Sequence, residues 1–246
     1  MTTNVYDKLT GMMATDSRWS IEWGGFLLYI DDSGFDKIEL FNDCAVMFAG
    51  DSAEIEKWKR WMAINPSDLS EMPEPVKINV CISRESDLQV IYQYKQSIID
   101  ETGYFAGTGT NYALQCWLKN RDAKKAVATA TLSDHRSGGD VMYYDLKNKS
   151  SNLSSRVLGE ADLSAQYVSA QILSRGSFMN MALGLSGSIS FDQALLENPD
   201  LKEMKDMISA GTLTASAPFE GMGAPWPDEE RQKLKNAMQS ILDAKK

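Results

Sequence analysis

From Val5 to Leu40 the chain consists of short apolar runs separated by turn residues, a pattern typical of antiparallel strands joined by hairpins. A clear turn lies at Asp31-Asp32-Ser33-Gly34. The run Cys44–Ala49 is continuously apolar and ends at Gly50, which predicts a strand buried on both faces. The runs that predict the earlier strands are NVY, GMMAT, GFLLYI and KIEL.

A helix is predicted directly after this strand, because the apolar residues take up helical spacing there. Asp51 and Ser52 can cap it, and Asn65-Pro66 should end it. Beyond it, SDLSEMPEP is expected to be a polar linker, and VKINVCIS and DLQVIYQY predict two more strands. The apolar positions of the helix are Ile55, Trp58, Trp61 and Met62.

Two helices and one strand are predicted between positions 107 and 146. A Gly/Thr turn opens the first helix, and Asp122 begins the second, which ends at Ser133-Asp134. DVMYYDL follows as a strand, so the order of elements favours an α+β layered fold over a doubly wound sheet. The first helix is expected to bury Ala113, Cys116, Trp117 and Leu118.

After Leu146 the composition changes, beginning with NKSSNLSSR, which predicts a polar surface loop. Asn198-Pro199 and Gly211 bracket a short helix, and Pro227 opens a last one. We expect a single domain over residues 1–246, in which residues 147–246 form a longer C-terminal part without an assigned role. The inward positions of these two helices are Leu201, Met204, Met207 and Ile208, then Leu234, Met238, Ile241 and Leu242.

The composition is that of an ordinary globular protein, with 43% hydrophobic and 24% charged residues among 246. The 25 Lys and Arg against 34 Asp and Glu give a net charge of −9, which excludes dedicated binding to nucleic acid or anionic membranes. Neither a signal-peptide pattern nor an apolar run long enough to cross a bilayer occurs, so we expect a cytoplasmic protein.

Histidine and cysteine usage limits the available chemistry. His135 is the only histidine, so a multi-histidine metal site cannot be built. Cys44, Cys81 and Cys116 are far apart in sequence and form no CxxC pair, so we expect reduced, buried packing residues. We therefore expect no metal and no cofactor.

The amino terminus is the most informative position for chemistry. Thr2 is a small residue after Met1, so removal of the initiator methionine would leave a threonine with a free α-amine. Such a residue combines a hydroxyl nucleophile with an amine whose ordinary pKa is about 7.7 to 8.0, which can act as a general base near neutral pH. Taken alone this start is weak, because any protein can begin with Met-Thr.

Six motifs along residues 2 to about 146 strengthen this interpretation: Thr2-Thr3, Ala14-Thr15-Asp16-Ser17-Arg18, Asp36-Lys37-Ile38-Glu39-Leu40, Phe48-Ala49-Gly50, Gly107-Thr108-Gly109-Thr110 with Tyr112-Ala113, and Asp134-His135-Arg136-Ser137-Gly138-Gly139. In order and approximate spacing, they resemble the threonine proteases of the proteasome β-subunit and bacterial HslV family. Each motif is moderately specific, and the resemblance rests on all six together.

The resemblance implies an N-terminal-nucleophile (Ntn) hydrolase fold, a four-layer αββα sandwich of two antiparallel sheets between helices. It makes Thr2 the nucleophile and the Gly50 N–H the donor to the oxyanion. It places Lys37 beside the Thr2 hydroxyl, where its charge favours the alkoxide, and it makes Asp16 the partner that keeps Lys37 ionised.

Further roles follow from the same resemblance. Thr108, Asp134 and Ser137 would bond around the Thr2 amine and orient it. Phe48 would line a shallow pocket for the substrate residue before the cleaved bond. The implied activity is hydrolysis of a peptide or protein substrate in a homo-oligomeric ring of the bacterial type.

Each motif also has an interpretation without catalysis. Asp16-Ser17-Arg18 can be a turn with a surface ion pair, and Lys37 an ordinary exposed strand lysine. The second function is therefore a catalytically silent binding protein with the same fold, such as an immunity or inhibitory partner protein, and the long C-terminal part favours it. Hydrolysis of an amide in a small molecule is a third, because the same nucleophile can perform it.

Overall fold

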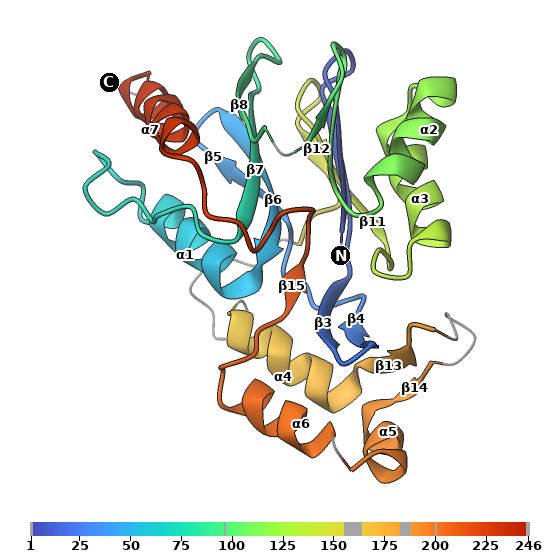
Figure 1. Ribbon diagram of the computed structural model, residues 1–246. Coiled ribbons are helices and arrows are strands. Elements are labelled where there is room, and N and C mark those ends of the chain that lie inside the picture. The colour runs from blue at the N-terminus through green and yellow to red at the C-terminus, as the bar shows by residue number, and fades with distance from the viewer. Residues whose placement is uncertain (1, 96, 155–163, 183–187, 200, 245–246) are drawn as a thin grey trace.

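The computed structural model describes residues 2–95, 97–154, 164–182, 188–199 and 201–244. Their strands form two antiparallel sheets (Figure 1). Sheet A has the order β12-β11-β2-β1-β10-β9. Its strands are β1 (Thr3–Asp7), β2 (Met12–Asp16), β9 (Ile98–Ile99), β10 (Gly103–Gly107), β11 (Val141–Asp145) and β12 (Ser150–Ser151).

Sheet B has the order β14-β13-β4-β3-β15-β6-β7-β8, and β5 pairs with β6 beside this path. Its longest strand, β6, is buried along seven of its eight residues, as the apolar run predicts. The strands of sheet B are β3 (Trp19–Trp23), β4 (Phe26–Ile30), β5 (Ile38–Phe41), β6 (Cys44–Asp51), β7 (Ile78–Arg84), β8 (Val90–Gln93), β13 (Ser177–Asn180), β14 (Ile189–Ser190) and β15 (Ser216–Ala217).

Two of the helices begin where the sequence places their caps. The Asp51 side chain accepts from the N–H groups of Ala53 and Glu54, and that of Asp122 accepts from Lys125 N–H. None of the helices in the described ranges is long and apolar enough to cross a lipid bilayer. The helices are α1 (Ser52–Ala63), α2 (Thr110–Asn120), α3 (Ala123–Ser133), α4 (Ala165–Arg175), α5 (Phe191–Glu197), α6 (Leu201–Ser209) and α7 (Asp228–Asp243).

Alternation along the strands sorts most buried side chains into three hydrophobic layers, beside a smaller cluster of Leu27, Tyr29 and Met179. In β1, Tyr6 belongs to the core between the sheets, whereas Val5 packs with α2 and α3 on the outer face of sheet A. In β6, Met47 belongs to the same inner core, whereas Val46 packs in the core beyond sheet B. Since successive side chains of a strand point to opposite faces, both sheets are covered on two sides.

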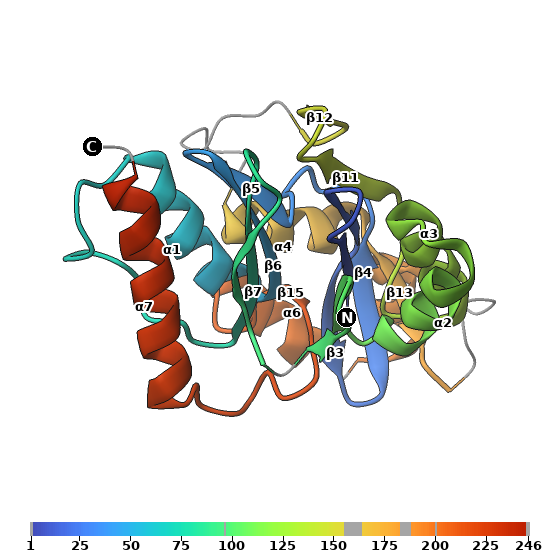
Figure 2. The same cartoon turned by 90° about the horizontal axis from the view of Figure 1, so that it is seen from above.

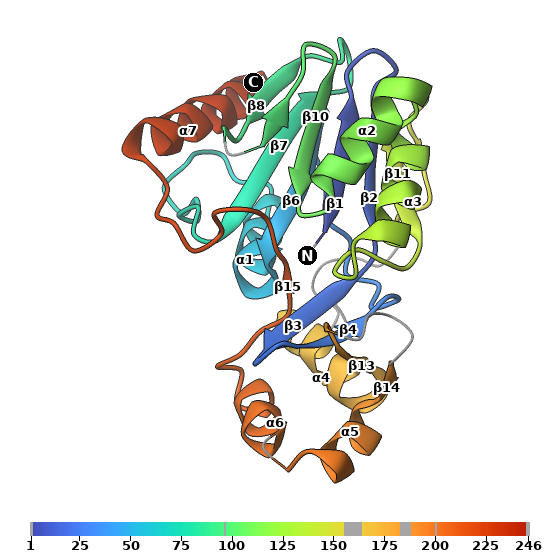
Figure 3. The same ribbon diagram turned by 45° about the vertical axis from the view of Figure 1, so that its right-hand side comes forward.

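Helices cover the two outer faces. The pair α2 and α3 lies against sheet A, and α1 and α7 lie on the far side of sheet B, with α4 beside β4 and α6 packed on α4 (Figures 2 and 3). The four-layer αββα arrangement of two antiparallel sheets between helices is thereby confirmed. The C-terminal part is built into it, because α4, α6, α7 and β15 contribute to the core of sheet B.

The structure differs from the sequence prediction in one helix and in several short elements. Leu118 is 49% exposed and Cys116 is partly exposed, so the prediction that both are buried is wrong. Ala113 and Trp117, four residues apart, form the inward stripe of α2, and Leu118 lies one residue further round the helix. The pattern did not reveal β3, β9, β10, β12, β13, β14, β15, α4 or α5, and β12 lies within the predicted loop NKSSNLSSR. The last two residues of NKSSNLSSR lie outside the described residues.

Candidate active site

The site residues come from the ends of both sheets. Thr2 directly precedes β1, and Asp16 ends β2, which pairs with β1 so that Asn4 lies opposite Thr15. Lys37 lies one residue before β5 of sheet B. Strand pairing in sheet A therefore brings Thr2 and Asp16 together, and the packing of the two sheets adds Lys37 from the facing layer.

The hydroxyl of Thr2 is held between a cation and a carboxylate. Nζ of Lys37 donates to Oγ1 of Thr2 over 2.8 Å, and Oγ1 donates to Oδ1 of Asp16. Lys37 also pairs with Oδ1 of Asp16 at 3.1 Å and donates to its backbone oxygen at 2.7 Å. All three residues are at most 1% exposed, so water screens these interactions little. The proton and the lone pairs of this hydroxyl are therefore fixed in direction, as a nucleophile requires.

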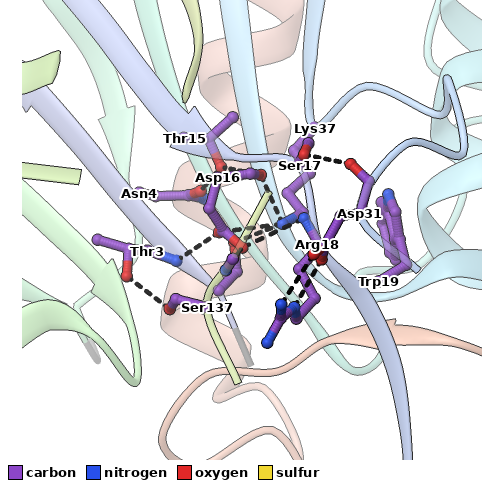
Figure 4. Close-up of polar contacts among 12 residues, drawn as sticks. Thr3, Asn4, Thr15, Asp16, Ser17, Arg18, Trp19, Asp31, Lys37 and Ser137 are labelled. Carbon is purple, nitrogen blue, oxygen red and sulfur yellow. Dashed lines mark hydrogen bonds and ion pairs between the residues drawn. The ribbon is translucent and has the colours of Figure 1, made fainter. Parts of the chain in front are cut away.

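Asp16 is the hub of the site (Figure 4). Besides Thr2 and Lys37, its carboxylate accepts from the backbone N–H groups of Thr3, Gly138 and Arg18 over 2.8, 3.0 and 3.3 Å. These donors and the nearby ammonium offset the cost of burying a carboxylate. Asp16 thereby joins β1, β2 and the loop after α3.

The protonation of Lys37 is affected by its burial. Removal from water lowers the pKa of Lys37 below its ordinary value, and the charge of Asp16 opposes that shift. A lysine with a lowered pKa gives up its proton more readily than a surface lysine. Lys37 can therefore donate to the threonine oxygen as an ammonium or exchange a proton with it.

The three residues expected around the Thr2 amine do come together. Oγ of Ser137 and Oγ1 of Thr108 both donate to Oδ2 of Asp134, over 2.8 and 2.9 Å. Ser137 then meets Thr3, with 2.8 Å between their hydroxyl oxygens. This chain therefore reaches β1 at Thr3, the neighbour of Thr2. Gly109 permits the approach, since a Cβ there would overlap Oγ1 of Thr3.

Gly50 and Phe48 lie on β6, on the other side of the site. Gly50 has φ +134, and a Cβ there would overlap the Lys77 carbonyl oxygen, so the position requires glycine. Phe48 is fully buried in the core beyond sheet B, and it lines neither of the two cavities described below. Its backbone does support the site, because Phe48 N–H donates to Lys37 O at 2.7 Å and Phe48 O accepts from the Asn4 side chain at 2.9 Å.

Sequence reasoning missed the role of Arg18. It is 5% exposed, its guanidinium pairs with both carboxylate oxygens of Asp31 at 2.6 and 2.8 Å, and Nη1 donates to His135 O at 2.6 Å. The Arg18–Asp31 pair is therefore not the surface ion pair considered as an alternative. A Cβ at Gly138 would overlap the guanidinium, so Gly138 lies directly on Arg18. The motifs Asp16-Ser17-Arg18 and Ser137-Gly138-Gly139 could have indicated this role of Arg18 from the sequence.

Asn4 and Thr3 were also missed as site residues. Oδ1 of Asn4 accepts from the Thr15 hydroxyl at 2.6 Å, and both residues are buried. Thr3 contributes its N–H to Asp16 and its hydroxyl to Ser137. Polar residues at the buried end of two paired strands could have indicated them.

Two cavities flank the site. One of about 220 Å³ is lined by Asp16 and Lys37 together with Asp31 and Asp36, and one of about 390 Å³ is lined by Gly107 and Thr108. Thr2 itself is fully buried. In the described part of the chain, His, Cys, Asp and Glu side chains form no group of three that could hold a metal ion.

Comparisons with known proteins give structural neighbours only. No family model matches the chain, and no curated protein matches it. Among solved structures, BPH of Thiobacillus denitrificans in complex with epoxomicin is 16% identical with a TM-score of 0.41, covering 58% of this chain and 97% of that one. HslV of Trypanosoma brucei is 14% identical with a TM-score of 0.38, covering 57% and 97%. At this similarity they do not establish a shared activity.

Proposed function

We propose that this chain is an N-terminal threonine hydrolase that cleaves amide bonds of peptides with Thr2 after removal of Met1. The observation that carries the proposal is the 2.8 Å contact from Nζ of Lys37 to Oγ1 of Thr2, whose hydroxyl donates to Asp16 inside a fully buried site. Met1 lies outside the described residues. Its removal is part of the proposal.

The proposed reaction has two steps. The free α-amine of Thr2 takes the hydroxyl proton as Oγ1 attacks the carbonyl carbon of the amide, and Lys37 stabilises the developing charge on Oγ1. The Gly50 N–H donates to the oxyanion of the tetrahedral intermediate. The C–N bond then breaks, and the leaving amine takes its proton from the α-ammonium. Water hydrolyses the ester that remains on Thr2, with the amine again acting as base.

The polar chain Thr108–Asp134–Ser137 has a positioning role in this proposal. It is fastened to β1 through the hydroxyl of Thr3, directly beside the residue whose amine must be oriented. Once Met1 is absent, Thr2 carries a free amine directly before Thr3. Phe48 is proposed to shape the substrate pocket from beneath, through the backbone of β6.

Labelling with a peptide epoxyketone tests the proposal, because closure of its ring adduct uses both a hydroxyl and an amine on one residue. Protein that begins at Thr2, obtained from the native host or by cleavage of an N-terminal fusion, should gain one label per chain, mapped to Thr2 by mass spectrometry. Protein that retains Met1 and the variant Thr2→Ala should gain none, whereas Thr2→Ser should keep partial reactivity. Unlabelled protein beginning at Thr2 would contradict the proposal.

One observation favours a second function, that of a catalytically silent binding protein. Thr2 is 0% exposed, so a substrate reaches its oxygen only after a change in what covers it. Retention of Met1 in protein isolated from the native host would support this function over hydrolysis. The third function, hydrolysis of a small-molecule amide, would be supported by turnover of single-residue amides but not of peptides. A homo-oligomeric ring remains a proposal, tested by sedimentation.

A further inference from the structure

Strand β15 has a special place in sheet B. It is two residues long and lies between β3 and β6, which in the described residues are joined to each other only through it. Ser216 lies opposite Ser20 of β3 and also opposite Asp51 of β6, and Ala217 lies opposite Gly50. The other edge of β6 is paired with β7 from Cys44 to Gly50. The sheet therefore has a slot between β3 and β6 that a distant part of the chain fills.

The occupant is a short extended segment with small side chains. Ala215 and Ala217 are fully buried, and Ala215 O accepts from the Ser52 N–H at 2.9 Å. Thr214 donates its hydroxyl to Oδ2 of Asp51 at 2.7 Å. Beyond it, the buried ring of Phe219 packs edge-on against Tyr94, with 6.3 Å between ring centroids.

Both walls of the slot lead to the Thr2 site. Ser20 on one wall follows Arg18, whose N–H donates to Asp16. Gly50 on the other wall follows Phe48, whose N–H donates to Lys37 O. Glu220, which directly follows the segment, lines the cavity of about 390 Å³ together with Gly107, and a Cβ at Gly107 would overlap the carbonyl oxygen of Thr2. The slot therefore lies next to the residues that hold Asp16 and Lys37 in place around Thr2.

Residues 214–219 have features that allow the segment to dissociate from the slot. Two paired residues are fewer than the usual three to ten of a strand, and such short pairings lie at the low end of local stability. Glycines flank the segment, with Gly211 and Gly221 at φ +72 and +78. The helices on either side, α6 and α7, are anchored in the core by Leu201, Met204, Leu234 and Met238.

We propose that residues 214–219 are an internal inhibitor of the Thr2 site, and that an extended peptide substrate reaches Thr2 by replacing β15 between β3 and β6. The inference rests on the proposed function of Thr2. Strand addition supplies affinity through main-chain hydrogen bonds, and the neighbouring side chains supply specificity. Because Ala215 and Ala217 are fully enclosed, the slot selects peptides with Ala, Ser or Gly at two alternate positions.

Gly50 has a different partner in the resting chain and in the proposed catalytic complex. In the resting chain, Ala217 is the sheet partner of Gly50, the residue whose N–H is proposed to donate to the oxyanion. A bound peptide can use the backbone of Gly50 only when Ala217 withdraws. The internal segment competes at the high effective concentration of a tethered ligand, so an external peptide must bind well or the segment must be weakened.

Two variants change how often residues 214–219 occupy the slot, one lowering and the other raising this occupancy. Ala217→Pro removes an N–H at the centre of the sheet and opens the slot, because proline cannot pair there. Ser20→Cys with Ser216→Cys places two thiols opposite each other and locks the segment when oxidised. The control lock is Ser177→Cys with Ser190→Cys, two serines that also lie opposite each other in sheet B, on β13 and β14.

The first readout is binding of a fluorescent peptide that copies residues 212–220, Thr-Leu-Thr-Ala-Ser-Ala-Pro-Phe-Glu, measured by anisotropy. Affinity should fall in the order opened, wild-type, locked, with at least about tenfold between the opened and oxidised locked forms, the factor that corresponds to about 1.4 kcal/mol. Reductant should restore the locked form, and the control lock should bind as the wild-type does. Equal affinity in the opened and locked forms overturns the inference.

The second readout separates this inference from the proposed function. With proteins that begin at Thr2, a peptide epoxyketone should label the opened form faster than the wild-type and the oxidised locked form slowest. A small β-lactone, which needs no strand pairing, should distinguish the three forms much less than the epoxyketone does. Equal labelling by the epoxyketone overturns the inference and leaves the function standing. If neither reagent labels Thr2, the proposed function is wrong, and the peptide-binding measurement alone tests whether a peptide can replace β15.

Discussion

The backbone N–H of Gly138 donates to Oδ2 of Asp16 over 3.0 Å, across 122 residues of sequence. This bond fastens the loop that carries Asp134 and Ser137 to the carboxylate that receives the Thr2 hydroxyl. Two motifs that are distant in the chain therefore act as one unit. A glycine lies at this position because a Cβ there would overlap the guanidinium of Arg18.

Gly138→Ala should destabilise the protein by about 2 kcal/mol or more, because the added methyl group overlaps the buried Arg18 guanidinium. Gly223→Ala is the matched control, since a Cβ there meets nothing within 4 Å, and it should change stability by less than about 0.5 kcal/mol. Urea denaturation measures both. Equal effects of the two substitutions would show that Gly138 is not in close contact.

Asp16→Ala should cost about 3–5 kcal/mol, because it leaves the ammonium of buried Lys37 without its carboxylate partner. Adding Lys37→Met to this variant should recover part of the loss by removing the stranded charge. A double-mutant cycle from denaturation curves gives the coupling energy. Both single variants should also lose labelling at Thr2. Additive losses of stability and unchanged labelling would refute the buried pair.

Stability should fall between pH 10 and 12 partly through Tyr6. Burial raises the pKa of Tyr6 from 10.0 to about 12, while its hydroxyl donates to Leu88 O at 2.9 Å. Above pH 10 the phenol of the unfolded chain loses its proton and that of the folded chain keeps it, so the Tyr6 contribution is complete below pH 10 and declines by about 3 kcal/mol as pH rises to 12.

Tyr6→Phe should remove this part of the alkaline decline. Urea denaturation at several pH values compares the variant with the wild-type protein, whose difference should be constant below pH 10 and shrink above it. Ser83, which donates to the Tyr6 hydroxyl, has Leu88 O and Gln89 O as other acceptors at 3.3 and 3.2 Å. Parallel curves over the whole range would contradict the raised pKa.

Only one of the three thiols should react with iodoacetamide in the native protein. Cys44 and Cys81 are fully buried, and burial raises the pKa of Cys44 to about 12 and that of Cys81 even further. Cys116 is partly exposed on α2. Peptide mapping at about pH 8 should find Cys116 alkylated first, and all three only in denaturant. Alkylation of Cys81 in the folded protein would contradict the core arrangement.

Local patterns in the sequence predicted the layers and the nearest parts of the site. Period-two alternation and continuous apolar runs determine which strand faces can be buried, so Tyr6 and Val5 separate onto opposite faces of sheet A in any packing of that strand. The caps at Asp51 and Asp122 are local as well, since each side chain bonds to amides within three residues. Thr2, Asp16 and Lys37 were identified through motif order, and the structure brings these three together.

The partners of the remaining site residues were decided by tertiary structure alone. Arg18 is buried on Asp31 and Gly138, and Thr3 meets Ser137, because whole layers pack and bring distant loops to one sheet end. The two-residue strand β15 carries no periodicity that a sequence pattern can reveal. Its position arises because β3 and β6 leave an unpaired gap, and unpaired backbone groups inside a sheet are costly enough to recruit a segment from far along the chain.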